Sequence, residues 1–190
     1  AEPDLQVLTC AAVRPGNGTG TMATVPSVYV ILGTPGSGRR EIVRDLVENG
    51  LEAADKVQVL LADSEAADPA DALLAGRAAT TVTRWTGAPD LPDADLVPGA
   101  TVFLLADPRG DAVSQIEALK PWLAERGAEL ARVLAVVDCQ FAEKHPALLA
   151  WYEACIHFAD VVLLTHREGV ANKWVSDFMR HFADQFFPCL

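Results

Sequence analysis

Short apolar runs alternate along the chain with segments in which apolar residues recur every three or four positions. Most of the runs are rich in β-branched residues and apolar throughout, as is typical of strands buried on both faces. The other segments have the period of amphipathic helices. The expected strands are Val28–Leu32, Val57–Ala62, Ala79–Arg84, Ala100–Ala106, Arg132–Val137 and Val161–Thr165, and the expected helices are Arg39–Asn49, Pro69–Ala75, Asp111–Arg126, Pro146–His157 and Val170–Phe187.

This alternation predicts an α/β fold: a three-layer α/β/α domain with a mostly parallel sheet of about six strands. We expect residues 1–26 to be a flexible N-terminal lead-in with one short strand at Gln6–Cys10, and residues 27–190 to form the domain. Ligands of such sheets bind beyond the carboxyl ends of the strands. The candidate functional residues are therefore those that directly follow a strand.

Composition narrows the classes of partner. The 190 residues carry a formal net charge of -11, which argues against nucleic acid and against an anionic membrane surface as partners. The chain has no apolar run long enough to cross a bilayer. Its four cysteines form no C-x-x-C pair, so a structural zinc site is not expected, and no disulfide framework is visible. A cytoplasmic location is the expectation.

The segment that follows the first predicted strand carries the clearest motif. Gly33, Gly36, Ser37 and Gly38 form a glycine-rich turn between a strand and a helix, and Gly33 and Gly38 have the spacing of the phosphate-binding loop G-x-x-x-x-G-K-[ST]. In such a turn the backbone N–H groups and the positive end of the helix face an anion. The turn therefore predicts a bound phosphate or nucleotide.

Two positions of this motif depart from the pattern. Arg39 stands where the lysine belongs, and Arg40 stands where the magnesium-binding hydroxyl belongs. A guanidinium can pair with phosphate oxygens, but it cannot ligate magnesium. We expect Arg39 to contact a phosphate, and we do not expect efficient magnesium binding at the position of Arg40. The alternative is a tight strand–helix turn with two solvated arginines.

Three more segments have partial motifs in a consistent order. Leu105-Ala106-Asp107-Pro108 follows one strand, Val136-Val137-Asp138 ends another, and Thr165-His166-Arg167-Glu168 follows a third. With the glycine-rich turn, they resemble the nucleotide-binding domain of CobW-type P-loop GTPases, the metal-chaperone family that includes the nickel-insertion GTPases. The resemblance spans roughly residues 27–187 and implies a P-loop NTPase-like fold.

The resemblance implies roles for these residues and shows where they have changed. Thr165, His166 and Glu168 occupy the family's base-reading motif [NT]-K-x-D, with the lysine and the aspartate replaced. Thr101 and Leu104 stand where the glutamate and glycine of the nucleotide-sensing switch belong. The cysteine-rich metal motif is expected around residues 80–87, and no cysteine is present there. A degenerate member is implied, a pseudo-GTPase that binds GTP, GDP or phosphate weakly and does not hydrolyse it efficiently.

Three other interpretations remain open. The chain can be a non-catalytic scaffold that contacts a protein partner or a second copy of itself, having lost nucleotide binding. It can be an active GTP-binding metallochaperone-type protein. It can also be a metal-dependent enzyme that uses the strand-end acids Asp63, Asp107 and Asp138, although acids in such positions more often cap helices or turns.

Overall fold

The computed structural model describes residues 6–9, 25–86 and 91–183. Residues 6–9 form the short strand expected near the N-terminus, β1 (Gln6–Thr9). The rest of the expected lead-in, apart from its last two residues, lies outside the described residues, as do the last residues of the expected C-terminal helix.

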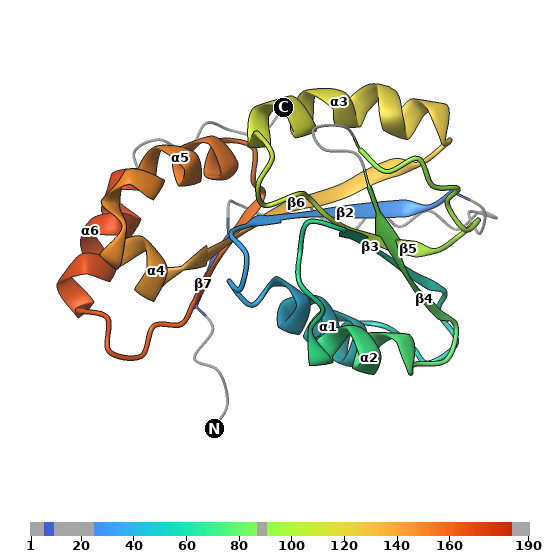
Figure 1. The fold of residues 1–190 in the computed structure, drawn as a ribbon, viewed down its shortest axis with the longest axis horizontal. Coiled ribbons are helices and arrows are strands. Elements are labelled where there is room, and N and C mark those ends of the chain that lie inside the picture. Colours follow the sequence, from blue (N-terminus) through green and yellow to red (C-terminus); the bar gives the residue numbers. More distant parts are fainter. Residues whose placement is uncertain (1–5, 10–24, 87–90, 184–190) are drawn as a thin grey trace.

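Seven strands form one sheet in the order β1-β7-β6-β2-β5-β3-β4 (Figure 1). Six of them run parallel to one another, and β1 pairs antiparallel with β7 at the edge. The parallel strands are β2 (Ser27–Gly33), β3 (Val57–Ala62), β4 (Thr80–Trp85), β5 (Thr101–Leu105), β6 (Glu129–Asp138) and β7 (Val161–Thr165).

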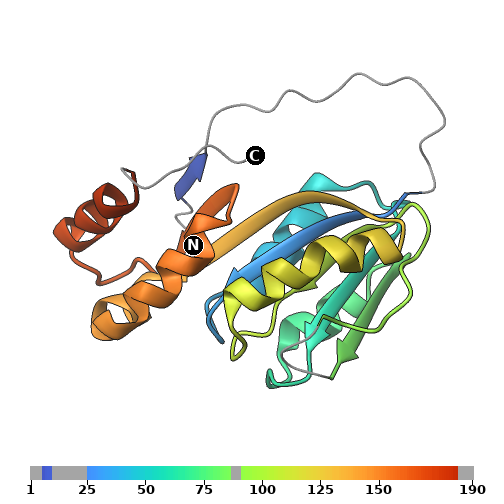
Figure 2. The same ribbon diagram turned by 90° about the horizontal axis from the view of Figure 1, so that it is seen from above.

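Helices cover both faces of the sheet, which confirms the predicted three-layer α/β/α architecture (Figures 1 and 2). One face carries α1 (Arg39–Gly50) and α2 (Pro69–Ala75). The other face carries α3 (Ala112–Glu125), α4 (Cys139–Lys144), a 3₁₀ turn at Pro146–Leu148, α5 (Leu149–His157) and α6 (Asn172–Ala183).

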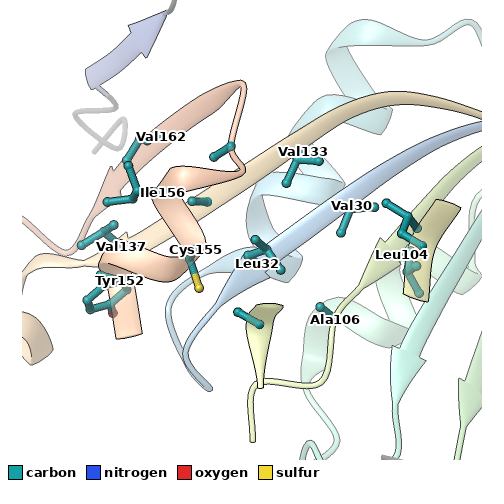
Figure 3. Packing of buried hydrophobic residues seen from close by; sticks show 14 of the residues in the cluster. Val30, Leu32, Leu104, Ala106, Val133, Val137, Tyr152, Cys155, Ile156 and Val162 are labelled. Carbon is teal, nitrogen blue, oxygen red and sulfur yellow. The ribbon is translucent and has the colours of Figure 1, made fainter. Parts of the chain in front are cut away.

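Alternation along the strands divides the core into two clusters. In β2, Val30 and Leu32 face one layer, and Ile31 faces the other. The layer of Ile31 packs under α1 and α2, whereas the layer of Val30 packs under α3 to α6. Figure 3 shows this second layer, where Tyr152 and Cys155 of α5 lie among strand side chains that include Leu32. A strand buried on both faces explains the continuous apolar runs in the sequence.

The predicted elements agree with the structure within a few residues, with one exception. The short helix α4 was not predicted, because the six residues that follow Asp138 are too few to show a helical period. Helix α3 continues through Pro121 to Glu125. Within the described residues, no helix is both long and apolar enough to cross a membrane.

The central strands set the stability of the domain. Leu104 in β5 is fully buried, and replacing it with Ala leaves a cavity, so we expect Leu104→Ala to lower the free energy of unfolding by about 2–5 kcal/mol. Leu73 in α2 is 57% exposed, and Leu73→Ala is the matched control, with an expected change within about 0.5 kcal/mol. Urea unfolding measures both, and equal losses would contradict the assigned core.

Candidate functional site

The turn between β2 and α1 lies at the carboxyl edge of the sheet, beside the ends of β5, β6 and β7. Gly33 is buried, and a Cβ added to it would lie 2.9 Å from each of three atoms: Arg39 Cδ, Ser37 Oγ and the carbonyl oxygen of Val136. Gly36 is exposed at the tip with φ +73°, and nothing lies within 4 Å of a Cβ built there. The first glycine is thus required by close packing and the second by the left-handed backbone.

The N-terminus of α1 opens onto this turn without a side-chain cap. Gly38 is the N-cap residue, with φ 85°, and it has no side chain to accept hydrogen bonds from the first-turn amides. Ser37 is 1% exposed, and its Oγ has no hydrogen-bond partner among the described residues. The Ser37 hydroxyl faces Gly33, inside the turn. Helix amides without a side-chain cap and a buried, unpaired hydroxyl are groups that can hydrogen-bond to an oxygen-rich anion.

Arg39, at the position of the lysine, points into the protein. It is 3% exposed, and its Nη1 donates to the carbonyl oxygens of Ala106 (2.7 Å) and Ile31 (3.3 Å), at the ends of β5 and β2. Its Nη2 donates to the carboxylate of Glu65. Burial lowers the pKa of Arg39 from its ordinary value, and the neighbouring Glu65 carboxylate opposes this effect.

Arg40, at the position of the magnesium-binding hydroxyl, is also buried and points toward α2. Its Nη2 lies 3.4 Å from the second carboxylate oxygen of Glu65, and its Nε lies 3.3 Å from Asp71 Oδ1. The Nε and Asp71 Oδ1 face each other without hydrogen-bond geometry. Asp71 in turn pairs with Arg84 of β4 at 2.7 Å. The expected alternative of solvated arginines is therefore wrong: both are buried in an ion-pair network.

Thr165 ties the turn to the end of β7. Its hydroxyl donates to the carbonyl oxygen of Ser37 at 2.8 Å and lies 3.1 Å from the carbonyl oxygen of Val137. Its methyl group would lie 3.6 Å from a Cβ at Gly38. The first base-reading candidate thus contacts the glycine-rich turn itself, and one hydroxyl links the ends of β7 and β6 to the turn that follows β2.

The other two base-reading candidates lie farther out on the surface. His166 is exposed, has a positive φ of 50°, and its Nδ1 lies 2.9 Å from Asp138 Oδ2. Glu168 is exposed, and its carbonyl oxygen accepts a hydrogen bond from Gln140 Nε2 at 2.8 Å. Asp138 also accepts from the Phe141 amide and caps α4. On this side of the turn, the exposed His166 ring is therefore paired with the Asp138 carboxylate.

Two of the three strand-end acids, Asp107 and Asp138, have structural partners. Asp107 is 4% exposed and accepts from the Ser64 hydroxyl at 2.7 Å and from the Arg109 amide at 2.9 Å. Asp63 is exposed at the end of β3. Among the described residues, no group of three or more His, Cys, Asp or Glu side chains is placed to hold a metal ion, so Asp63, Asp107 and Asp138 do not form one.

The switch position implied by the resemblance lies at the wrong end of its strand. Thr101 is the first residue of β5 and pairs with Ser27, at the amino edge of the sheet. Leu105 and Asp107 lie at the opposite end, about 13 Å farther along or more. Leu104 is fully buried in the core. Neither Thr101 nor Leu104 can sense a ligand at the turn.

Helix α5 closes the inner side of the turn. Tyr152 is fully buried, and its hydroxyl lies 3.2 Å from Thr34 Oγ1 (Figure 3 shows its place in α5). Burial raises the pKa of Tyr152, and it raises the pKa of the Cys155 thiol to about 12. The thiol is therefore protonated at neutral pH and is not a nucleophile. The accessible part of the turn is its outer surface at Pro35 and Gly36.

Sequence reasoning did not identify most partners of the two arginines. No motif in the sequence indicates that Glu65 lies between two guanidinium groups. Asp71 belongs to a capping box with Asp68, a signal that is visible in the sequence as D-P-A-D and that predicts a helix start but no ion pair. Arg84 lies on β4, and only the parallel pairing of β3 and β4 brings it to Asp71.

Comparisons with family models, with curated proteins and with solved structures found no match to this chain.

The Thr165 hydroxyl is the simplest part of the site to test. Thr165→Val keeps the shape of the side chain and removes the hydrogen bond to the turn, so we expect a loss of about 1 kcal/mol in the free energy of unfolding. Thr83 is exposed on β4, and Thr83→Val is the control, expected to change stability little. Chemical denaturation measures both, and an unaffected Thr165→Val variant would show that the bond does not hold the turn.

Proposed function

We propose that this protein is a degenerate CobW-like P-loop GTPase domain, a cytoplasmic pseudo-GTPase that binds a phosphate group of a nucleotide and does not hydrolyse it efficiently. The observation that carries this proposal is the uncapped N-terminus of α1 behind a glycine-rich turn, with the Ser37 hydroxyl buried and unpaired. Backbone amides and a helix dipole attract a phosphate without any lysine.

The residues at the turn do not fit a magnesium ion. The position of the ligating hydroxyl is Arg40, whose guanidinium lies against Glu65 and Asp71. A cation held there repels a divalent metal, and Asp107 is occupied by Ser64 and by the Arg109 amide. Metal-assisted phosphoryl transfer has no support in this arrangement.

Support for a nucleotide rather than a free phosphate comes from the neighbouring loop. Thr165 contacts the turn through Ser37, and His166 and Glu168 follow it directly on the surface. An exposed imidazole can stack on or donate to a base, so GTP and GDP are the first ligands to test. Titration with other nucleotides measures which base the loop prefers.

A second candidate is a non-catalytic scaffold that has lost ligand binding. The observation that favours it is that Arg39 and Arg40, the cations of the turn, are paired with acids of the same chain. A charge placed at Gly36 separates the two candidates, because only the nucleotide-binding protein responds to it.

A negative charge at the tip of the turn must oppose a phosphate. Gly36→Asp adds a carboxylate in open space, whereas Gly36→Asn adds a neutral group of the same shape, and both residues tolerate a positive φ. By isothermal titration with GDP, we expect Gly36→Asn to retain most of the affinity and Gly36→Asp to lose at least about tenfold. Equal affinity in the two variants, or no binding by the wild-type protein, contradicts the proposed site.

The poor fit of the described turn residues to a magnesium ion gives a separate prediction. We expect the dissociation constant for GDP or GTP to be the same in magnesium and in EDTA, because no ligated metal bridges the protein and the phosphates. Incubation of GTP with the protein and magnesium should release phosphate no faster than the buffer alone. Magnesium-dependent binding, or phosphate release that scales with protein concentration, would instead support an active GTPase.

A further inference from the structure

Glu65 holds an unusual position beside the phosphate-binding turn. Its carboxylate lies between two buried guanidinium groups, with Oε1 on Arg39 and Oε2 at 3.4 Å from Arg40. The Glu65 side chain is 7% exposed. Paired oxygens facing two guanidinium groups are the arrangement with which arginines recognise phosphate. The protein therefore supplies from its own chain the kind of anion that these arginines bind.

Arg40 is incompletely satisfied by its partners. A guanidinium has five N–H donors. The contact with Glu65 is long, the Nε faces Asp71 without hydrogen-bond geometry, and Asp68 Oδ2 is 4.0 Å away. A buried cation with this few good hydrogen bonds retains capacity for another acceptor. The unpaired Ser37 hydroxyl and the uncapped amides of α1 lie on the same turn.

The charges of this network cancel. Arg39, Arg40 and Arg84 are matched by Glu65, Asp68 and Asp71, each linked by the contacts above. Because the sum is zero, the arginines add little net attraction for an anion at the turn. Glu65 belongs to the segment between β3 and α2, residues 63–68, which is neither strand nor helix.

We propose that Glu65 is an internal competitor for the phosphate ligand, which keeps the affinity of the turn low by occupying Arg39 and Arg40. The inference rests on the proposed function and concerns regulation of that same site. The ligand class that displaces Glu65 is a phosphate monoester or a diphosphate, because a dianionic oxygen cluster offers the arginines more charge and more acceptors than one carboxylate. No metal takes part in the exchange.

The test is isothermal titration of inorganic pyrophosphate, in EDTA, into four forms of the full chain. Glu65→Gln removes the internal charge, and we expect it to bind pyrophosphate at least tenfold more tightly than the wild-type protein. Glu48→Gln changes the net charge equally at an exposed position in α1 and should bind like the wild type. The double variant Glu65→Gln/Arg40→Met should lose the gain.

The outcomes separate this inference from the proposed function. The competitor role is overturned if the wild-type protein binds pyrophosphate and Glu65→Gln binds it equally or more weakly. It is also overturned if the gain in affinity persists in the double variant that lacks Arg40. Both results leave the proposed function standing. No binding by any form overturns both. If circular dichroism shows that Glu65→Gln does not fold, the same titration is carried out on Glu65→Asp. Its carboxylate is one methylene shorter and cannot bridge both arginines, so it should bind more tightly than the wild type, and unchanged affinity refutes the proposal.

Discussion

A buried guanidinium must have a partner, and two of them lie side by side at the first turn of α1. Arg39 and Arg40 are 3% and 7% exposed, and the carboxylate of Glu65 is shared between them. Removing one partner from a buried ion pair costs about 3–5 kcal/mol, a large part of the total stability of a small domain. The position of the segment after β3 is therefore coupled to the start of α1, and through it to the glycine-rich turn.

The same edge of the sheet is fixed from the other side by hydrogen bonds rather than by charge. Thr165 links the Ser37 and Val137 carbonyls, and the Tyr152 hydroxyl lies on Thr34. The turn is thus held by ion pairs toward β3 and by hydroxyl groups toward β6 and β7. The outer tip of the turn, Pro35 and Gly36, is exposed, whereas Arg39 and Arg40 are buried.

The sequence predicted the layers of this fold well, because strands buried on both faces give continuous apolar runs that are hard to mistake. Val57–Ala62, Pro69–Ala75 and Val161–Thr165 have the bounds that the pattern predicted. The helix at Cys139–Lys144 was missed because six residues are too short to show a period. The order of the strands could not be predicted from the sequence, because it depends on which face of the sheet each connecting helix crosses.

The candidate site was predicted in part, for a similar physical reason. Spacing in the sequence identified the turn, and Thr165 was named from its motif, but the direction in which Arg39 and Arg40 point is decided by acids 25 or more residues away. The spacing of a motif indicates where the backbone atoms lie, but it does not determine which residues the side chains contact. The placement of Thr101 shows the limit of the resemblance, since a matched position in the sequence lies at the opposite edge of the sheet.

The two arginines also explain why acids gather beside the turn. The interior cannot hold two guanidinium groups unless acids lie against them. Here Glu65 and Asp71 meet that need, and Arg84 balances Asp71 in turn. Each charge is stable only in the presence of the others, so the set acts as one structural unit. Under the proposed function, the affinity for phosphate rests on the backbone of the turn and on how firmly Glu65 is held in this network.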